Sequence, residues 1–342
     1  VPTPVLYFST VYLNTGSGVA ITGSHNPPEY NGLKMMLAGE TLFGDGIAAL
    51  YDRIVSGDLY TASNEGSYEE VDVVPAYIEK ILSDVKLSRP IKVAVDAGNG
   101  IAGPLAVKLL TKLGAEVTEM FTNVDGNFPN HHPDPSKPEN LVDLQAQLKS
   151  GDEEIGVAFD GDGDRLGVVA KDGEIIFPDR QAMLFAGDIL AHKKGSVIVH
   201  DVKCTRNIRP FVESRGGVCV MSKTGHSLIK AKMKEVNADF AGEMSGHIFF
   251  HDRWPGFDDG VYAATRLLEI VTRFDDANKP LKDLPNAVST PELQIPTEEG
   301  ENFTLVEKLS KNAKFDDAKD IIRIDGIRVE WDDGFALARP SN

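Results

Sequence analysis

The run Asp160-Gly-Asp162-Gly-Asp164 places three carboxylates at alternating positions, with a glycine between each pair. The glycines allow the backbone to curl until all three side chains face one point. Hard oxygen ligands at this density suit Mg²⁺ or Ca²⁺. Without a cation the carboxylates would repel one another, and they follow an apolar run at 155–159 rather than a surface helix. We therefore predict a divalent cation site. An EF-hand is excluded, because the sixth and twelfth residues counted from Asp160 are neither Gly nor Glu.

A second polar loop, with the sequence TGSHNPP at 22–28, carries Ser24 directly after an apolar run, and Lys34 follows it. A serine at the end of a strand is presented outward, where it can act as a nucleophile or carry a phosphoryl group. The loop is not the GxSxG elbow of hydrolases, since Asn26 stands where the second glycine should be. A serine and a histidine in such a turn are often purely structural, but the predicted metal site, Arg165 and Lys34 make phosphate chemistry possible here.

Further polar groups follow other apolar runs. The loop GEMSGH offers a carboxylate, a hydroxyl and an imidazole within five residues, a set suited to gripping sugar hydroxyls: Glu243, Ser245 and His247. Lys203 and the segment 223–226, which ends in His226, add basic groups. The terminal Arg339-Pro-Ser341-Asn342 provides a guanidinium, a hydroxyl and an amide, which suit a phosphate.

One motif points to different chemistry. The segment GNGIAG at 98–103 matches GxGxxG directly after the apolar run 92–96, and Glu119 follows about 20 residues on, which is the spacing of a dinucleotide-binding fingerprint. We interpret it as a tight strand-to-helix turn, because a nucleotide site would normally open the cofactor domain and would leave the Asp160 loop without a role. An NAD-dependent dehydrogenase remains the alternative from another class.

Strands and helices must alternate to position these loops. Short apolar runs that end in Gly-rich turns predict strands within 17–24, 91–100, 154–164, 195–203 and 238–246. Helical patterns lie between them, at 102–113, 140–149, 178–192, 226–236 and 258–273. This alternation predicts α/β domains with mostly parallel sheets, in which ligands gather at the carboxyl ends of strands. The junctions at 18–26, 156–164 and 239–247 resemble one another, as in a weak internal repeat that sends one loop per copy to a shared centre.

Composition excludes several classes of protein. With 35 Lys+Arg against 52 Asp+Glu the formal net charge is −17, which argues against a nucleic-acid binder and against adhesion to an anionic membrane. No stretch reaches the roughly 18 continuous apolar residues of a spanning helix. The two cysteines form no CxxC pair, which fits a reducing compartment, so we expect a cytoplasmic protein.

Taken together and in this order, TGSHNP, DGDGDR, GEMSGH and the terminal RPSN resemble the α-D-phosphohexomutase superfamily, and within it the bacterial phosphomannomutase/phosphoglucomutase group. The resemblance implies three related mixed-sheet α/β domains, the first truncated at its N-terminus, plus the start of a smaller α+β C-terminal domain. The expected boundaries are 1–69, 70–173, 174–286 and 287–342. Because family members extend beyond both ends of this sequence, we expect the chain as given to be weakly active or inactive.

The resemblance also implies roles for the residues. Ser24 would be the phosphoserine, and it would share one Mg²⁺ with Asp160, Asp162 and Asp164. The other expected catalytic residues are Lys34, Arg165 and His226. Substrate would be bound by Lys203, by the sugar-loop residues Glu243, Ser245 and His247, and by the phosphate-loop residues Arg339, Ser341 and Asn342.

The implied activity is that of an isomerase. It would interconvert hexose 6-phosphate and hexose 1-phosphate, for mannose and glucose, through a hexose 1,6-bisphosphate, with glucose 1,6-bisphosphate as activator. Its partners would be small phosphosugars, with neither nucleic acid nor membrane, and the protein would be a monomer. Two alternatives from the same residues remain: a phosphoglucosamine mutase, and an inactive module that binds Mg²⁺ or phosphosugars.

Overall fold

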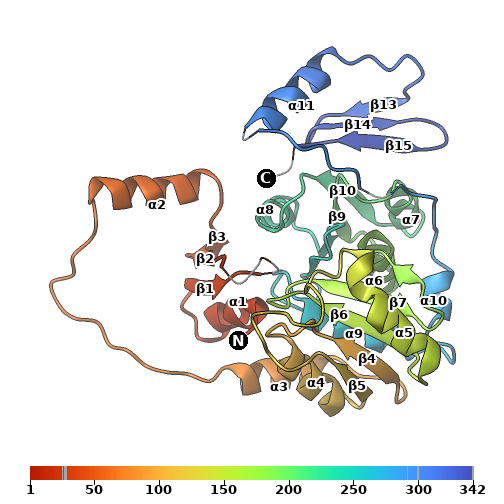
Figure 1. Cartoon of the computed structure of the whole chain (residues 1–342), viewed down its shortest axis with the longest axis horizontal. Coiled ribbons are helices and arrows are strands. Elements are labelled where there is room, and N and C mark those ends of the chain that lie inside the picture. The colour runs from red at the N-terminus through yellow and green to blue at the C-terminus, as the bar shows by residue number, and fades with distance from the viewer. Residues whose placement is uncertain (25, 27–28, 291, 299, 341–342) are drawn as a thin grey trace.

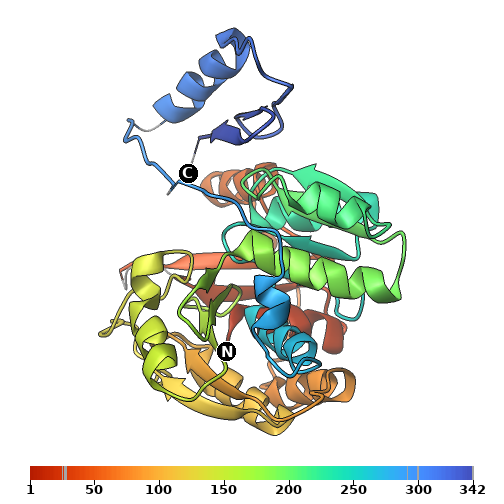
Figure 2. The same cartoon turned by 90° about the vertical axis from the view of Figure 1, so that its right-hand side faces the viewer.

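The computed structural model describes residues 1–24, 26, 29–290, 292–298 and 300–340. Four sheets follow one another along this part of the chain. Figure 1 shows the second and third sheets packed together, with the first sheet at one side and the last sheet beyond the third. The view in Figure 2 shows the same C-terminal unit standing apart from the main body.

The first sheet is small and antiparallel, in the order β1-β2-β3. It is formed by β1 (Gly18–Thr22), β2 (Gly32–Leu37) and β3 (Glu40–Thr41), and it is flanked by α1 (Thr3–Tyr12) and α2 (Asp45–Ser56). Thr22 pairs with Gly32, so the loop between β1 and β2 leaves and re-enters the sheet at the same end. That loop carries Ser24, and Lys34 lies on β2 two residues beyond the pair.

The second sheet has the order β5-β4-β6-β7-β8 and pairs its first three strands in parallel. Its strands are β4 (Lys92–Asp96), β5 (Glu116–Met120), β6 (Ile155–Phe159), β7 (Leu166–Ala170) and β8 (Ile175–Ile176). Its helices are α3 (Val74–Asp84), α4 (Gly103–Leu113), the 3₁₀ turn η1 (Pro138–Leu141) and α5 (Val142–Ser150). Every residue of β6 and β7 is buried, as expected for central strands covered on both faces.

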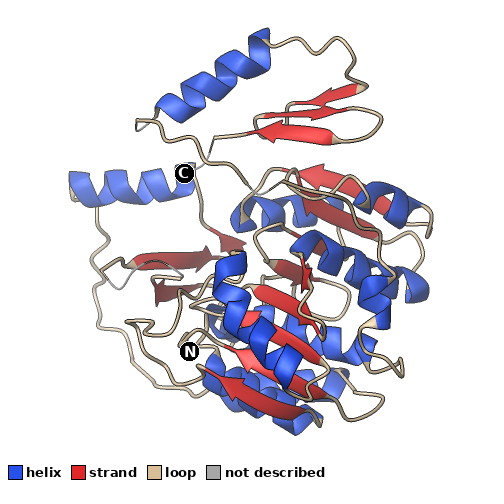
Figure 3. Cartoon of the chain, turned by 45° about the vertical axis from the view of Figure 1, so that its right-hand side comes forward, coloured by secondary structure: helices blue, strands red, loops and turns tan. Residues whose placement is uncertain are grey.

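The third sheet has the order β10-β9-β11-β12, with β12 antiparallel to β11. Its strands are β9 (Val197–Asp201), β10 (Val218–Ser222), β11 (Phe240–Gly242) and β12 (Ile248–Phe250). Its helices are α6 (Pro178–His192), α7 (Ile208–Glu213), α8 (His226–Val236), α9 (Gly260–Val271) and α10 (Lys279–Lys282). Figure 3 shows helices against the second and third sheets.

The last unit contains α11 (Glu301–Asn312) and an antiparallel sheet of β13 (Asp320–Ile322), β14 (Ile327–Glu330) and β15 (Phe335–Ala338). Arg328 anchors this sheet to the third one, because its buried Nη1 donates to the carbonyl oxygens of Val202 and Cys204, at 2.6 and 2.7 Å. The last sheet is therefore tied to the loop that follows β9.

All twelve residues of α9 are buried, and this helix contacts β6 and β7 of the second sheet as well as β12 of the third. An aromatic cluster continues this core, with Trp254 stacked on Tyr262 at 4.4 Å and on Phe8 at 5.8 Å. Burial of such large rings is a main source of stability in a core. Because α9 packs against both the second and the third sheet, it holds the loops of these two sheets together.

The alternation of strands and helices is confirmed, and the expected helices are found within a few residues of their predicted bounds. The expectation of mostly parallel sheets is wrong. Among the described residues, parallel pairing is confined to β5-β4-β6 and to β10-β9-β11. The first sheet, the last sheet and the pairs β6-β7, β7-β8 and β11-β12 are antiparallel, because these strands are joined by turns or loops rather than by crossover helices.

The interpretation of GNGIAG as a structural turn is supported by close backbone packing. A Cβ on Gly103 would lie 2.5 Å from the carbonyl oxygen of Thr122, and one on Gly100 would lie 2.9 Å from that of Gly161. The glycines therefore let α4 begin directly beside β5 and beside the Asp160 loop. Among the described residues, no helix is long and apolar enough to span a bilayer.

Candidate active site

The three aspartates of the predicted metal loop converge, as their spacing indicated. Asp160, Asp162 and Asp164 are buried, and each offers a carboxylate oxygen within 4.8 Å of the others. The loop is curled by Asp160 Oδ1, which accepts the amide hydrogens of Gly163 and Arg165 at 3.0 and 3.1 Å. Gly163 itself has φ +80°, a conformation that glycine adopts without steric cost.

The three buried carboxylates of this loop lie close enough together to repel one another, so a bound cation would stabilise them. Burial raises the pKa of Asp160 well above its usual value, and the charges of Asp164 and Asp162 raise it further. Asp162 Oδ1 is buried and accepts no hydrogen bond from any described residue. An orphaned acceptor among three clustered carboxylates fits a hard divalent cation, for which oxygen ligands are preferred. The buried acidic cluster is therefore a candidate metal site.

Lys34 of β2 enters the cluster from the first sheet. Its Nζ lies 2.7 Å from Asp162 Oδ2 and 2.5 Å from Asp164 Oδ2. Burial alone would lower the pKa of this lysine, but the charges of Asp164 and Asp162 raise it well above the usual value. Thr3 of α1 also donates to Asp162 Oδ2, at 2.5 Å. The first sheet and α1 are thus held directly against the metal loop.

Ser24 faces the same cluster, with its Oγ 3.4 Å from Asp160 Oδ2. Its φ of +51° is in the left-handed region that few non-glycine residues occupy, and its amide donates to Thr22 Oγ1 at 2.8 Å. Such outliers cluster at functional sites. A cavity of about 580 Å³ adjoins Ser24 and is also lined by Asp162. The neighbouring His25 lies outside the described residues.

Arg165 connects the metal loop to the sugar loop. Its Nε is 3.8 Å from Asp160 Oδ2 and 3.4 Å from His247 Nε2, and its Nη1 is 3.8 Å from Asp134. The backbones of Arg165 and His247 also form an isolated antiparallel bridge. The second and third sheets therefore place their polar loops side by side.

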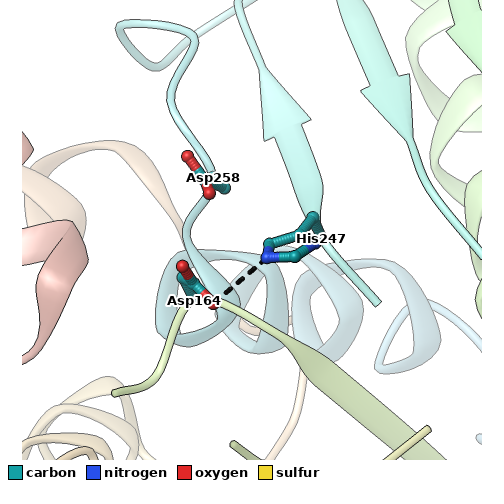
Figure 4. Close-up of side chains that lie close together, drawn as sticks. All are labelled: Asp164, His247 and Asp258. Atoms are coloured by element: carbon teal, nitrogen blue, oxygen red, sulfur yellow. Dashed lines mark ion pairs between the residues drawn. The ribbon is translucent and has the colours of Figure 1, made fainter. Parts of the chain in front are cut away.

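Within the sugar loop, His247 is surrounded by acceptors. Its Nε2 pairs with Asp164 Oδ1 at 3.3 Å, the ion pair that is dashed in Figure 4. Its Nδ1 lies 3.3 Å from Glu243 Oε2 and 2.8 Å from Ser245 Oγ. Burial would lower the pKa of His247, but Asp164, with support from Glu243, raises it to about 9. Glu243 Oε1 also accepts the amide hydrogen of Gly225, at 2.5 Å, which joins this loop to the start of α8.

His226 completes this central group, because its ring stacks on that of His247 with centroids 5.5 Å apart. Lys203 and Arg339 make their contacts elsewhere. Lys203 Nζ pairs with Glu292 at 2.6 Å, and Arg339 Nε pairs with Asp325 at 3.1 Å. Ser341 and Asn342 lie outside the described residues. One connected cluster thus contains most of the predicted site residues, namely Ser24, Lys34, Asp160, Asp162, Asp164, Arg165, His226, Glu243, Ser245 and His247.

Sequence reasoning missed two charged residues beside this cluster. Asp258 is fully buried and pairs with His226 Nδ1 at 3.1 Å and with Lys230 Nζ at 2.9 Å. In the sequence, Asp258 precedes an apolar helical pattern and reads as an ordinary helix start. Lys230 lies one turn after His226, and this i, i+4 spacing was the available signal that both share a helix face.

Three family models match the chain. They describe the phosphoglucomutase/phosphomannomutase alpha/beta/alpha domains I, II and III, at residues 1–61, 75–173 and 177–290. The phosphoglucomutase of Neisseria gonorrhoeae is 56% identical, and the match covers all of this chain and 75% of that protein. The phosphomannomutase/phosphoglucomutase of Pseudomonas aeruginosa is 51% identical, over all of this chain and 73% of that protein.

A solved structure agrees with these matches. The phosphoglucomutase/phosphomannomutase family protein of Burkholderia thailandensis superposes with a TM-score of 0.93 at 55% identity, covering all of this chain and 75% of that one. The resemblance found in the four motifs is therefore confirmed, and the chain belongs to the phosphoglucomutase/phosphomannomutase family of isomerases, within the α-D-phosphohexomutase superfamily.

Proposed function

We propose that the phosphoglucomutase/phosphomannomutase activity of this chain proceeds through a phosphoryl group carried on Ser24. The observation that carries the proposal is the position of Ser24 Oγ, 3.4 Å from Asp160 Oδ2 at the edge of the carboxylate cluster. A hydroxyl held there in a left-handed turn is presented to the cavity that it lines. We propose Mg²⁺ as the cation, held by Asp160, Asp162, Asp164 and an oxygen on Ser24.

In the forward step a sugar hydroxyl attacks the phosphorus on Ser24. The new bond forms between that hydroxyl oxygen and phosphorus, the bond from phosphorus to Ser24 Oγ breaks, and the hydroxyl proton passes to a basic group of the site. Lys34 and His226 are the proposed groups for proton transfer or substrate contact, and Arg165 would stabilise negative charge on the transferred phosphoryl group. Mg²⁺, when bound, supplies further positive charge to the phosphoryl oxygens.

The product of this step is a hexose 1,6-bisphosphate, which must turn end over end before it returns its other phosphate to Ser24. Contacts to hydroxyls in the middle of the ring suit both orientations, and we assign them to Glu243, Ser245 and His247. Lys203, Arg339, Ser341 and Asn342 would bind the phosphate that does not react. Glucose 1,6-bisphosphate would act as activator, because it can phosphorylate Ser24 directly.

Further proposals concern the substrates, state and organisation of the protein. We propose that glucose and mannose phosphates are its partners and that it is a cytoplasmic monomer, in keeping with its charge of −17 and two buried free cysteines. We propose domains at 1–69, 70–173, 174–286 and 287–342. The second sheet extends slightly past the second of these ranges, because its last strand, β8, begins at Ile175.

Mass spectrometry of the intact protein tests the covalent step. We expect the mass of one phosphate on Ser24, its loss on incubation with glucose 6-phosphate or mannose 6-phosphate, and its return with glucose 1,6-bisphosphate. Ser24→Ala should abolish both the modification and turnover, whereas Ser9→Ala, at a serine of α1 bonded to the Leu6 carbonyl, should change neither. A Ser24→Ala protein with full activity would remove the covalent mechanism.

A further inference from the structure

The loop before α9, residues 251–259, joins the third sheet to the metal loop. Asp258 forms a backbone bridge with Phe249, in the middle of β12. Two residues later, the amide of Gly260 donates to the carbonyl oxygen of Gly163 at 3.2 Å. The side chain of Asp258 therefore stands between the sugar loop and the metal loop, and Figure 4 shows it close to Asp164 and His247.

Asp258 has a basic side chain beside each of its oxygens. Its Oδ1 lies 2.9 Å from Lys230 Nζ and its Oδ2 lies 3.1 Å from His226 Nδ1, although the side chain is fully buried. Burial alone would raise the pKa of Asp258, but Lys230 and His226 together bring it below its usual value, so the group stays a carboxylate. Lys230 is fixed in turn by the ring of Tyr7, whose centroid is 4.2 Å from Nζ.

The ring of His226 has its Nδ1 buried, while its Nε2 lies 3.5 Å from the hydroxyl oxygen of the neighbouring Ser227. The side chain is 27% exposed, while its partner Asp258 is 0% exposed, so Nδ1 faces the interior. Stacking on His247, with an angle of 18° between the rings, restricts rotation of the imidazole. A neutral imidazole carries hydrogen on only one nitrogen, and a carboxylate beside one nitrogen favours hydrogen there. The other nitrogen, Nε2, is then an acceptor.

We propose that Asp258 is a positioning residue that holds His226 with its hydrogen on Nδ1, so that Nε2 presents a lone pair to a hydroxyl of the bound sugar phosphate. The sugar ligand in this statement rests on the proposed function above. Asp258 itself touches no substrate, and Lys230 balances its charge so that the carboxylate does not take the ring proton. A purely structural carboxylate, present only to neutralise Lys230, is the competing explanation.

The tautomer of His226 is measurable without any activity assay. In protein labelled with ¹⁵N-histidine, the His226 signals are those lost in His226→Gln, and they should report hydrogen on Nδ1 when the ring is neutral. Asp258→Asn should shift them toward the other tautomer or a mixture. A wild-type protein with hydrogen on Nε2 of His226 would overturn the proposal. This readout remains valid even if Ser24 is never phosphorylated, so it is separable from the proposed function.

Kinetics distinguish positioning from general structural support. We expect Asp258→Asn to lower kcat/KM for glucose 1-phosphate about tenfold, the order expected when one hydrogen bond to substrate is lost. His226→Gln should cause a similar loss, and the double variant should lose no more than either single one, because both changes remove the same contact. Losses that multiply in the double variant, or full activity in His226→Gln, would contradict the assignment.

The neighbouring Asp259→Asn serves as the matched control. Asp259 is equally buried, but it accepts the amide hydrogen of Tyr262 and caps α9, and asparagine caps helices about as well. Its kcat/KM and the His226 tautomer should stay as in the wild type. Thermal unfolding of each variant identifies any that fails to fold, and in that case the tautomer in the wild-type protein decides.

Discussion

Replacing Gly260 by alanine should disturb the metal loop through steric contact alone. Gly260 is the first residue of α9, and its amide is bonded to the carbonyl of Gly163. An added Cβ would lie 2.5 Å from the carbonyl oxygen of Arg165, 2.8 Å from its carbonyl carbon and 3.0 Å from the carbonyl oxygen of Gly163. All three atoms are backbone, so no flexible side chain can move aside.

The magnitude follows from these distances. Favourable contacts between such atoms lie at about 3.5–4.0 Å, so α9 and the metal loop must separate by roughly 1 Å. Forcing an extra methyl group into a packed interior costs about 1–3 kcal/mol of stability. A displacement near 1 Å at a reacting centre can lower the rate on the order of 100-fold. We therefore expect a modest loss of stability and a large loss of kcat in Gly260→Ala.

The assay couples conversion of glucose 1-phosphate to oxidation of glucose 6-phosphate by its dehydrogenase, with thermal unfolding measured in parallel. Gly46→Ala is the matched control. Gly46 is also near the start of a helix, α2, but its added Cβ would meet only Leu42, at an ordinary 3.4 Å. That variant should be as stable as the wild type or up to about 1 kcal/mol more stable. If Gly260→Ala kept wild-type kcat and melting temperature, the account of α9 as a support of the metal loop would be refuted.

Three further outcomes are expected. Burial lowers the pKa of His200 to about 4, below the ordinary 6.5, so the stability it contributes is fully present above pH 6.5 and is lost as pH falls toward 4. Between pH 6.5 and 4 the free energy of unfolding of the wild type, measured with denaturant, should fall by about 3 kcal/mol more than that of His200→Asn. If the two proteins lost stability in parallel over this range, the role of His200 would be excluded. Asp162→Asn should raise the Mg²⁺ concentration for half-maximal activity at least tenfold. Removing a residue that only supports a metal ligand already lowers metal affinity about 10–100-fold, and a ligand itself should matter at least as much. An unchanged Mg²⁺ titration would show that Asp162 is not a ligand. Arg328→Met removes charged hydrogen bonds to the two carbonyls that flank Lys203. This variant should lose about 3 kcal/mol of stability and show a higher KM. An unchanged KM would show that the anchoring of the last sheet does not affect substrate binding.

The sequence predicted the location of the chemistry better than the topology that presents it. The Asp160 loop could be identified because alternating carboxylates and glycines have few other uses, and the structure brings these side chains together. The direction in which strands pair was harder to predict. Local pattern does not distinguish a strand that returns by a short turn, such as β7, from one that returns through a helix.

What the sequence determined by itself is the set of local loops. Ser24, the three aspartates and the sugar loop are each specified by residues that lie close together along the chain, and their order carried the family assignment. The partners that fix these groups were decided only by the tertiary structure. Lys34 is 128 residues from Asp162, and His226 is 32 residues from Asp258. Such pairs depend on how the separate sheets, and α9 between the second and third of them, pack together. Packing of that kind is a property of the assembled core, which no local pattern encodes.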